Sequence, residues 1–500
     1  MSSHSKKVLI IGAGFAGMSA ASFLAQKGWK VTVVEKNTLP GGRARKFEAN
    51  GFVFDMGPSW YWMPDTFERY FSMFGKKVSD FYQLQRLDPS YRVYFEKAQW
   101  DIPANYEALQ QLLESIEPGA AKALDGFMEE AKFKYEVGVG KLVHQPGQSL
   151  TELIDIDLFK GIFKLDVFQS MKKHIAKYFK HPYIQFLMEF PVLFLGALPE
   201  NTPALYSLMN YADIKGGTWY PEYGMYSIVK GMYELASSLG VEFKLGEEVT
   251  KIEVINGVAK KAYTQVVATK ENKEYDFDIV VGAGDYHHIE SVLLEPAYQS
   301  YSKKYWDSRV MAPSSLLYYV GLNKKLPGVT HHSLFFDTDF GLHGKEIYTH
   351  PKWPTNPLFY ASVPSVTDPT VAPEGCENLF LLIPVAAGLE GDTEEVREKY
   401  FNDLIKRLEE KWGVSIMESI VYKRSFSVAD FKSDYHSFKG NAYGLANTLM
   451  QTANLKPSCR SKKVNNLYYT GQLTVPGPGV PPSLISGEVV ANLIDKNYSK

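Results

Sequence analysis

The hydrophobic pattern at the start of the chain predicts a strand, a helix and a second strand. Residues 8–11 are a short, fully apolar run, which is typical of a buried strand in a parallel sheet. Residues 18–27 combine large apolar side chains with Ala and Ser, and this predicted helix ends at Gly28. Residues 31–34 are a second apolar run, and Glu35 follows it. The order strand, helix, strand indicates the first unit of an α/β fold.

A glycine-rich turn, GAGFAG, joins the first strand to the helix. Gly12 allows a tight turn, Gly14 lets the backbone approach a pyrophosphate, and Gly17 permits close packing of the helix on the sheet. The N-terminus of the helix would offer unpaired N–H groups and a positive dipole end to the phosphates, and Phe15 and Ala16 in the turn are further candidate binding residues. We therefore predict a dinucleotide site at this turn.

The residues after the second strand distinguish among dinucleotides. Glu35 can accept hydrogen bonds from both ribose hydroxyls, which argues against NADP, and Lys36 beside it is a further candidate binding residue. Gly41 and Gly42 allow a second close backbone approach, and Arg43 can bridge phosphate oxygens. A ligand longer than NAD, folded back over the same turn, would use both features, so FAD fits better than NAD. A flexible turn is the alternative interpretation of the glycine pair.

The end of the chain carries a second candidate flavin contact. Residues 467–470 predict a strand that ends at Gly471, and a Pro- and Gly-rich loop leads into a helix that begins near Pro481 or Pro482. The N-terminus of such a helix can direct its dipole at the pyrimidine end of a flavin, where negative charge accumulates on reduction. A proline-rich surface turn is the alternative interpretation.

Further motifs are spread over nearly the whole chain. They are Gly41-Gly42-Arg43-Ala44-Arg45, Phe54-Asp55-Met56-Gly57-Pro58-Ser59, and the segments 219–225, 278–281, 466–471 and 476–481. With these motifs the chain resembles the flavin oxidoreductases and, more narrowly, the carotenoid desaturases of the bacterial and fungal phytoene desaturase type. The Pro- and Gly-rich motif at 476–481 is the specific signal.

The resemblance implies an α/β fold with three regions. A Rossmann-like FAD-binding domain would be assembled from the discontinuous segments 1–100, 221–295 and 455–500, so that both ends of the chain close over one FAD. Residues 101–220 would form a mostly helical substrate-entry and membrane-associating region, and residues 296–454 a mixed-sheet substrate domain. The further cofactor-binding residues that the resemblance implies are Gly57, Pro58, Ser59, Val249 (with its backbone beside the adenine), Gly471, Gly479 and Val480.

A second GxG sequence begins at Gly282, directly after the predicted strand 278–281. It lacks a third glycine in register and an acid at the end of a following strand, so we interpret it as a sheet connection. Reduced flavin would then pass its electrons to oxygen or a quinone rather than to NAD. His287 and His288 lie beyond this strand and are interpreted as a structural pair, and the pattern identifies no catalytic base.

Aromatic residues are abundant, with 32 Tyr, 30 Phe and 8 Trp, and an ordinary aromatic core is the simplest explanation. Trp60, Tyr61 and Trp62 nevertheless follow Ser59 directly, close to the segment that the resemblance places at the flavin. Rings on either side of a polyene provide dispersion contacts without hydrogen bonds. This cluster therefore predicts a hydrocarbon site beside the cofactor.

Residues 158–181 predict a basic amphipathic helix. Apolar residues at 158, 162, 165, 168, 171, 175 and 178 share one face, and lysines occupy the others. Such a helix either packs its apolar face into the core or lies in the headgroup region of an anionic membrane. Because a carotenoid must enter from lipid, the resemblance favours a cytoplasmic protein that is peripherally associated with the membrane. No apolar run is long enough to predict a transmembrane helix.

Composition excludes several classes of function. A net charge of −2 offers no general field for nucleic acid, and Cys376 and Cys459 are far apart without a metal-binding spacing. With no metal motif and no nucleophile triad, the favoured function is FAD-dependent desaturation of phytoene or a later carotene. The alternatives are 3,4-desaturation of a hydroxylated carotenoid, another flavin oxidase or retinoid saturase, and a carotenoid carrier with structural FAD.

Overall fold

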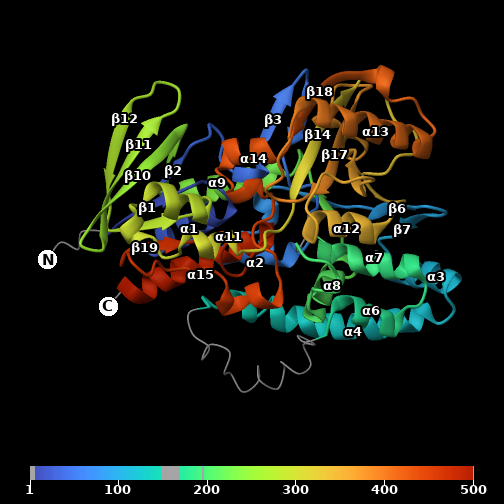
Figure 1. Ribbon diagram of the computed structural model, residues 1–500, viewed down its shortest axis with the longest axis horizontal. Helices are drawn as coiled ribbons and strands as arrows, with labels where there is room; N and C mark the ends of the chain where they lie inside the picture. Colours follow the sequence, from blue (N-terminus) through green and yellow to red (C-terminus); the bar gives the residue numbers. More distant parts are fainter. Residues whose placement is uncertain (1–5, 148–168, 194–195, 499–500) are drawn as a thin grey trace.

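The computed structural model describes residues 6–147, 169–193 and 196–498. One half of the molecule contains a parallel sheet with both chain termini nearby, and the other half contains a mixed sheet above a layer of helices (Figure 1). The parallel sheet has the order β19-β13-β1-β2-β9, and all its neighbours are parallel. Its strands are β1 (Lys7–Ile11), β2 (Lys30–Glu35), β9 (Glu242–Leu245), β13 (Ile279–Gly282) and β19 (Leu467–Tyr469).

Helices α1 (Phe15–Gln26) and α15 (Val480–Tyr498) pack closely against each other and join the two ends of the chain. The small residues of α1 permit this approach, and a side chain at Gly487 of α15 would overlap the backbone of Ala16. Ser19 Oγ also donates a hydrogen bond to the Leu484 carbonyl oxygen at 2.7 Å. The same half contains α9 (Tyr226–Ser238) and an antiparallel sheet of β10 (Glu247–Ile255), β11 (Val258–Val266) and β12 (Asn272–Asp276).

The mixed sheet has the order β18-β14-β17-β16-β15-β6-β7, in which only the β15–β6 pair is parallel. All nine residues of β14 are buried, because α13 covers one face of the sheet and the aromatic core covers the other. The predicted domain limit at residue 100 falls within this sheet, since β6 and β7 belong to it. Its elements are β6 (Tyr91–Phe95), β7 (Gln99–Ile102), β14 (Ser314–Leu322), β15 (His332–Phe336), β16 (Phe359–Ser362), β17 (Glu377–Val385), β18 (Ile420–Phe426) and α13 (Glu394–Trp412).

A layer of helices lies beneath this sheet (Figure 1). In α6 the apolar residues Met171 and Ile175 are buried in the core, whereas Lys172, Lys173 and Lys177 are exposed. The described part of the predicted amphipathic segment therefore packs its apolar face inward, and residues 158–168 lie outside the described chain. The layer contains α3 (Tyr106–Ile116), α4 (Ala120–Gly138), α6 (Met171–Tyr178), α7 (Pro182–Leu193), α8 (Leu208–Ile214) and, next to the sheet, α12 (Phe340–Tyr348).

No helix in the described residues is long and apolar enough to cross a membrane. The remaining elements are β3 (Lys46–Ala49), β4 (Phe52–Asp55), α2 (Pro64–Ser72), β5 (Leu84–Arg86), β8 (Trp219–Pro221), α10 (Tyr286–His288), α11 (Lys303–Asp307) and α14 (Val428–Tyr435).

Candidate active site

The glycine turn has the geometry that a pyrophosphate site requires. Gly12 has a φ of 108°, a conformation that favours glycine, and a side chain at Gly17 would overlap the Gly12 carbonyl oxygen. Gly14 differs from both, because a Cβ at this position would meet no atom within 4 Å. The turn is therefore closed on the helix side and open at Gly14, and the first N–H groups of α1, at Phe15 and Ala16, have no partner within their own helix.

The second glycine pair packs directly on the first turn. The Gly41 N–H donates a hydrogen bond of 2.7 Å to the Ala13 carbonyl oxygen. Gly42 has a φ of 56°, and a Cβ there would lie 3.4 Å from the Gly14 Cα. A side chain at Gly57 would in turn crowd the Arg43 carbonyl oxygen, at 2.6 Å. These contacts bring three glycine segments together, as the prediction of a second backbone approach requires.

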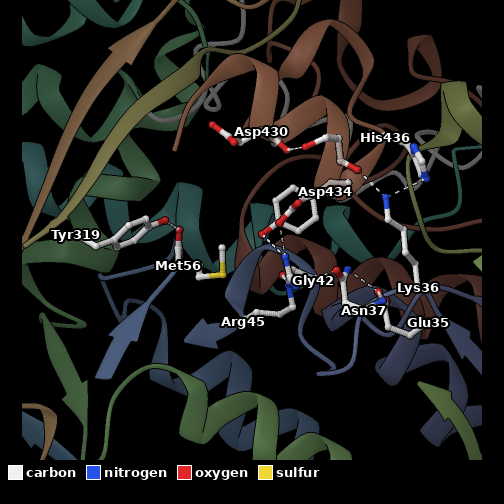
Figure 2. A network of polar contacts seen from close by, with 12 residues as sticks. Glu35, Lys36, Asn37, Gly42, Arg45, Met56, Tyr319, Asp430, Asp434 and His436 are labelled. Carbon is white, nitrogen blue, oxygen red and sulfur yellow. Dashed lines mark hydrogen bonds and ion pairs between the residues drawn. The ribbon is translucent and has the colours of Figure 1, made fainter. Parts of the chain in front are cut away.

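Glu35 lies at the end of β2 and points toward Asn37, as Figure 2 shows, and its carboxylate also contacts the glycine turn. One carboxylate oxygen accepts from the Ala13 N–H at 2.8 Å, and the other accepts from the backbone and the side chain of Asn37 at 2.9 and 2.8 Å. The network continues through Arg45, which pairs with Asp434 at 2.8 Å. Glu35 is thus fixed in orientation beside the turn, where a ribose would lie.

Arg43 offers the clearest test of whether an anionic cofactor fits this site. Its Nη2 donates to Ser437 Oγ at 2.8 Å and to the Asn441 carbonyl oxygen at 3.2 Å, but its Nε is buried without a hydrogen-bond partner. Burial lowers the pKa of the guanidinium, and the negative charge of Asp285 offsets this effect only in part. A buried cation with an open donor fits the pyrophosphate of a dinucleotide.

The C-terminal block reaches the same turn from the other side. The Gly471 N–H donates to Ser486 Oγ at 3.0 Å, and a Cβ at Gly471 would lie 3.8 Å from the Ala16 Cβ. Gly479 has a φ of 114°, and Val480 is the first residue of α15. The strand end at Gly471 and the second turn of α15 therefore lie against the start of α1, and the contact of α15 with a flavin stays a prediction.

Trp60 extends the Gly57–Ser59 segment into the mixed-sheet half. Its ring stacks on His332, with centroids 4.2 Å apart, and also contacts Tyr360 at 5.7 Å and Phe190 at 6.2 Å. Trp62 instead donates its indole N–H to Thr218 Oγ1 at 2.9 Å, deeper in the core. The predicted aromatic cluster therefore belongs partly to the core, through Trp62, and partly to the surroundings of Phe190 and Tyr360, through Trp60.

An apolar cavity lies next to this aromatic cluster. Strands β15, β16 and β17 contribute one side of it, and helices α7 and α12 contribute the other. Its walls are almost entirely hydrophobic, with only a few hydroxyls and one imidazole. The lining residues are Phe190, Pro313, Leu334, Phe336, Phe340, His343, Gly344, Ile347, Tyr348, Leu358, Phe359, Tyr360, Leu382, Pro384 and Tyr443.

A family model described as flavin containing amine oxidoreductase matches residues 15–495. The chain belongs to this family. Membership confirms the prediction of a flavin oxidoreductase with FAD as its cofactor. No cluster that could bind a metal ion occurs in the part of the chain that the structure describes.

Similar curated proteins place the chain among the carotenoid desaturases of the family, as predicted. A carotenoid 3,4-desaturase of Haloarcula japonica is 40% identical over 97% of this chain and 97% of its own. A ζ-carotene-forming phytoene desaturase of Myxococcus xanthus is 29% identical over 98% of this chain and 94% of its own. A 4,4′-diapophytoene desaturase of Staphylococcus aureus is 30% identical over 99% of each chain.

Two solved structures share the fold. An oxidoreductase from Methanosarcina mazei aligns with a TM-score of 0.61 and 16% identity, over 97% of this chain and all of its own. Cyclohexylamine oxidase from Brevibacterium oxydans aligns with a TM-score of 0.59 and 15% identity, over 99% of this chain and 100% of its own. At these identities the likeness concerns the fold alone, and it confirms the α/β class with mixed sheets.

Val249 and the histidine pair lie close to the end of β2 and to the segment after α14. Val249 is buried and packs in one cluster with Val34, the residue before Glu35. His288 stacks on His436 with centroids 4.0 Å apart, and burial lowers the pKa of His288 to about 3. His287 stacks on Phe438 at the same distance. These contacts agree with a structural role for the pair.

The structure adds residues that the sequence pattern did not indicate. His436 contacts Lys36 Nζ at 3.3 Å and Glu248 at 2.6 Å, so the segment after α14 covers the predicted ribose side. Lys456 is 5% exposed, and its Nζ donates to Asn447 at 2.8 Å. A Cβ at Gly477 would lie 2.9 Å from that Nζ, and burial lowers the pKa of Lys456 to about 7. Isolated polar residues in loops carry no periodic signal that could have revealed them.

Proposed function

We propose that this protein is an FAD-dependent carotenoid desaturase that introduces conjugated double bonds into phytoene or a later carotene. The observation that carries the proposal is the apolar cavity whose wall residues Phe190 and Tyr360 pack against Trp60, which directly follows the predicted flavin contact Ser59. A wall with few hydrogen-bonding groups suits a hydrocarbon and penalises a charged amine, since buried charges need partners. The desaturase names of the similar proteins support the same substrate class.

The main contribution of the protein chain to this reaction is to orient the substrate and to exclude water from it. When bound, the flavin supplies an acceptor for a hydride from a C–H next to an existing double bond. Aromatic rings such as Phe190 and Phe340 hold the polyene by dispersion and exclude water, while delocalisation along the polyene stabilises the positive charge. Orientation of one C–H toward the cofactor is therefore the principal task of the cavity.

Reconstitution with carotenes tests the proposal. The FAD-loaded protein is mixed anaerobically with liposomes that contain phytoene or a later carotene, and flavin bleaching and products are followed by absorbance and chromatography. In a desaturase the flavin absorbance bleaches, and the product has a longer conjugated system than the substrate. Bleaching with an amine or a retinoid but not with any carotene would instead identify another flavin oxidase or a retinoid saturase. Carotenoid binding without bleaching would identify a carrier.

The substrate of the most similar desaturase named above suggests a second candidate function. Identity to the carotenoid 3,4-desaturase is 40%, compared with 29% and 30% to the two desaturases that act on phytoene-type substrates. We include 3,4-desaturation of a hydroxylated carotenoid for this reason. Parallel assays with a hydroxylated carotene and with phytoene decide between the two, because product formation from only one of them assigns the step.

The proposal includes reversible attachment to a membrane, from which an insoluble substrate would enter. The exposed lysines of α6 support it through their charge, while the buried apolar face of that helix does not contribute. Oxygen or a quinone is the proposed electron acceptor. Anaerobic reoxidation of the reduced protein by a quinone, compared with reoxidation by air, identifies which of the two serves.

A further inference from the structure

Desaturation removes a proton as well as a hydride, and the cavity contains few groups that could take it. The ionisable side chains that line it are His343, Tyr348, Tyr360 and Tyr443. His343 is already saturated, because its Nδ1 accepts from the Leu358 N–H at 3.0 Å and its Nε2 bonds the Pro384 carbonyl oxygen at 2.9 Å. Protonation of this ring would break the first of these bonds.

The hydroxyl of Tyr360 contacts a histidine. The distance between Tyr360 Oη and His332 Nδ1 is 2.7 Å. The register of the mixed sheet explains the contact: Tyr360 lies opposite Leu334, and Ser362 lies opposite His332. Tyr360 and His332 are therefore diagonal neighbours on the same face of adjacent strands.

His332 is held in an unusual state. It is fully buried, its Nε2 has no hydrogen-bond partner, and burial together with the neighbouring His331 keeps its pKa well below the ordinary value. The imidazole is therefore neutral at rest. Its ring lies nearly parallel to Trp60, at an interplanar angle of 8°. An aromatic face at this position would stabilise a positive charge on the ring.

We propose that Tyr360 and His332 form the proton-accepting pair of the desaturation, an inference that rests on the proposed function. The Tyr360 oxygen forms a bond to the proton of the substrate carbon while its own proton passes to His332 Nδ1. The electron pair of the broken C–H bond becomes the second bond of the new double bond. The substrate has then lost one hydride to the cofactor and one proton to the pair, and the resulting imidazolium lies against Trp60.

A second cavity provides the exit for this proton. Its polar lining includes Asp55, Ser59, Tyr220 and His331. The rings of His331 and His332 are 4.4 Å apart, so this cavity begins directly beside the pair. Burial raises the pKa of Asp55 to about 6, although the N–H groups at the start of α9 counteract it. A proton released from His332 therefore meets polar groups on this side and hydrocarbon on the other.

The test uses the FAD-loaded holoenzyme with a carotene that the wild-type protein converts. For Tyr360→Phe we expect turnover to fall by about 100-fold, the usual contribution of a positioned base, with little change in KM. The solvent deuterium isotope effect on product formation should disappear, because the exchangeable tyrosine proton is gone. Carotene binding, measured by quenching of tryptophan fluorescence, and FAD content should stay within about twofold of wild type.

His332→Gln separates proton transfer from mere positioning. Glutamine can still accept the hydrogen bond from Tyr360 but cannot take its proton, so we expect the same loss as for Tyr360→Phe. The double variant should be no slower than either single variant, since both act in one step. Wild-type turnover in the His332→Gln variant would overturn the inference. It would show that His332 only orients Tyr360, because orientation needs the hydrogen bond and not the transfer of its proton.

Tyr348→Phe is the matched control, since it removes a hydroxyl from the same cavity without a histidine partner. This variant can change KM but should keep the isotope effect. Wild-type turnover in Tyr360→Phe, or loss of the isotope effect in Tyr348→Phe, would contradict the proposal. If Tyr360→Phe loses FAD, His332→Gln alone decides the question. Failure of the wild-type protein to desaturate any carotene would instead refute the proposed function.

Discussion

The predicted ligand sites in the two halves of the molecule are built from different parts of the chain, backbone in one half and side chains in the other. In the nucleotide half, backbone touches backbone: three glycine segments pack so closely that added side chains at Gly17 or Gly57 would collide with carbonyl oxygens. In the mixed-sheet half, aromatic and aliphatic side chains enclose a cavity, and the backbone is hidden behind them. Recognition of a phosphate therefore fixes backbone geometry residue by residue, whereas recognition of a hydrocarbon fixes only a volume and its shape.

Gly17→Ala tests the rigid half most severely. Because the new methyl group would overlap the Gly12 carbonyl oxygen, α1 must move away from β1. We expect loss of FAD and a decrease of about 3 kcal/mol or more in the free energy of unfolding, as for severe overpacking. Flavin absorbance of the purified protein and thermal melting measure the two effects. Gly14→Ala is the control: its methyl meets no atom, so it should melt like wild type and weaken only FAD binding. Equal melting of both variants would contradict this.

Arg43→Met tests the electrostatic contribution in the same half. It removes the buried cation assigned to the pyrophosphate, and we expect FAD affinity to fall by about 2–3 kcal/mol, the contribution of hydrogen bonds to a charged group. The FAD-free protein should keep or gain stability, since a buried guanidinium with an open donor is costly. Equilibrium dialysis measures the loss of FAD affinity, and melting of the apoprotein measures the change in its stability. A stability loss in the apoprotein would show that Arg43 is structural.

Glu488→Gln tests a charged contact between α15 and the helical layer, since His144, in the segment after α4, lies 3.4 Å from Glu488. Arg69 of α2, which follows the aromatic wall, forms two bonds of 2.7 Å with Glu488 of α15. Burial alone would raise the pKa of Glu488, but Arg69 and His144 outweigh it and lower the value to about 2. The stabilisation is thus complete above 4.5, the ordinary pKa of a glutamate, and is lost as pH falls toward about 2.

We expect Glu488→Gln to cost about 2 kcal/mol at pH 7, as for other hydrogen-bonded charge pairs that are removed on one side. Melting curves between pH 3 and pH 7 measure the effect. The difference between variant and wild type should shrink toward acid pH. A difference that stays constant with pH would show that the pair does not act through its charge.

Leu382→Phe tests the tolerance of the hydrocarbon half. The larger ring occupies part of the cavity, so we expect carotene conversion to decrease strongly while the free energy of unfolding changes by only about 1 kcal/mol, because space is available for the added atoms. FAD content should stay at the wild-type level. Flavin absorbance, melting and product chromatography measure the three effects together. A loss of FAD as large as that of Gly17→Ala would remove the distinction between the halves.

The same contrast explains how far sequence could predict this structure. The unit β1-α1-β2 follows from local periodicity and glycine chemistry, although α1 begins earlier than predicted because Gly14 itself caps it. The parallel pairing of β6 with β15 joins segments that are far apart along the chain, so no local pattern reveals it. The Tyr360–His332 contact depends on the register of two strands, and the position of Lys456 depends on loop packing. A phosphate site can thus be predicted from a short local sequence, whereas a hydrocarbon site cannot.

Lys172→Glu combined with Lys173→Glu concerns the surface beneath the cavity and should have the smallest effect on the chain itself. Both lysines are exposed on α6, so melting should be unchanged. Each lysine near an anionic surface contributes up to about 1 kcal/mol, and we expect weaker cosedimentation with anionic vesicles, most clearly at low salt. Lys230→Glu combined with Lys260→Glu, on α9 and β11, is the matched control and should leave cosedimentation nearly unchanged. Equal losses in both variants would mean that attraction depends on net charge alone and that α6 does not face the membrane.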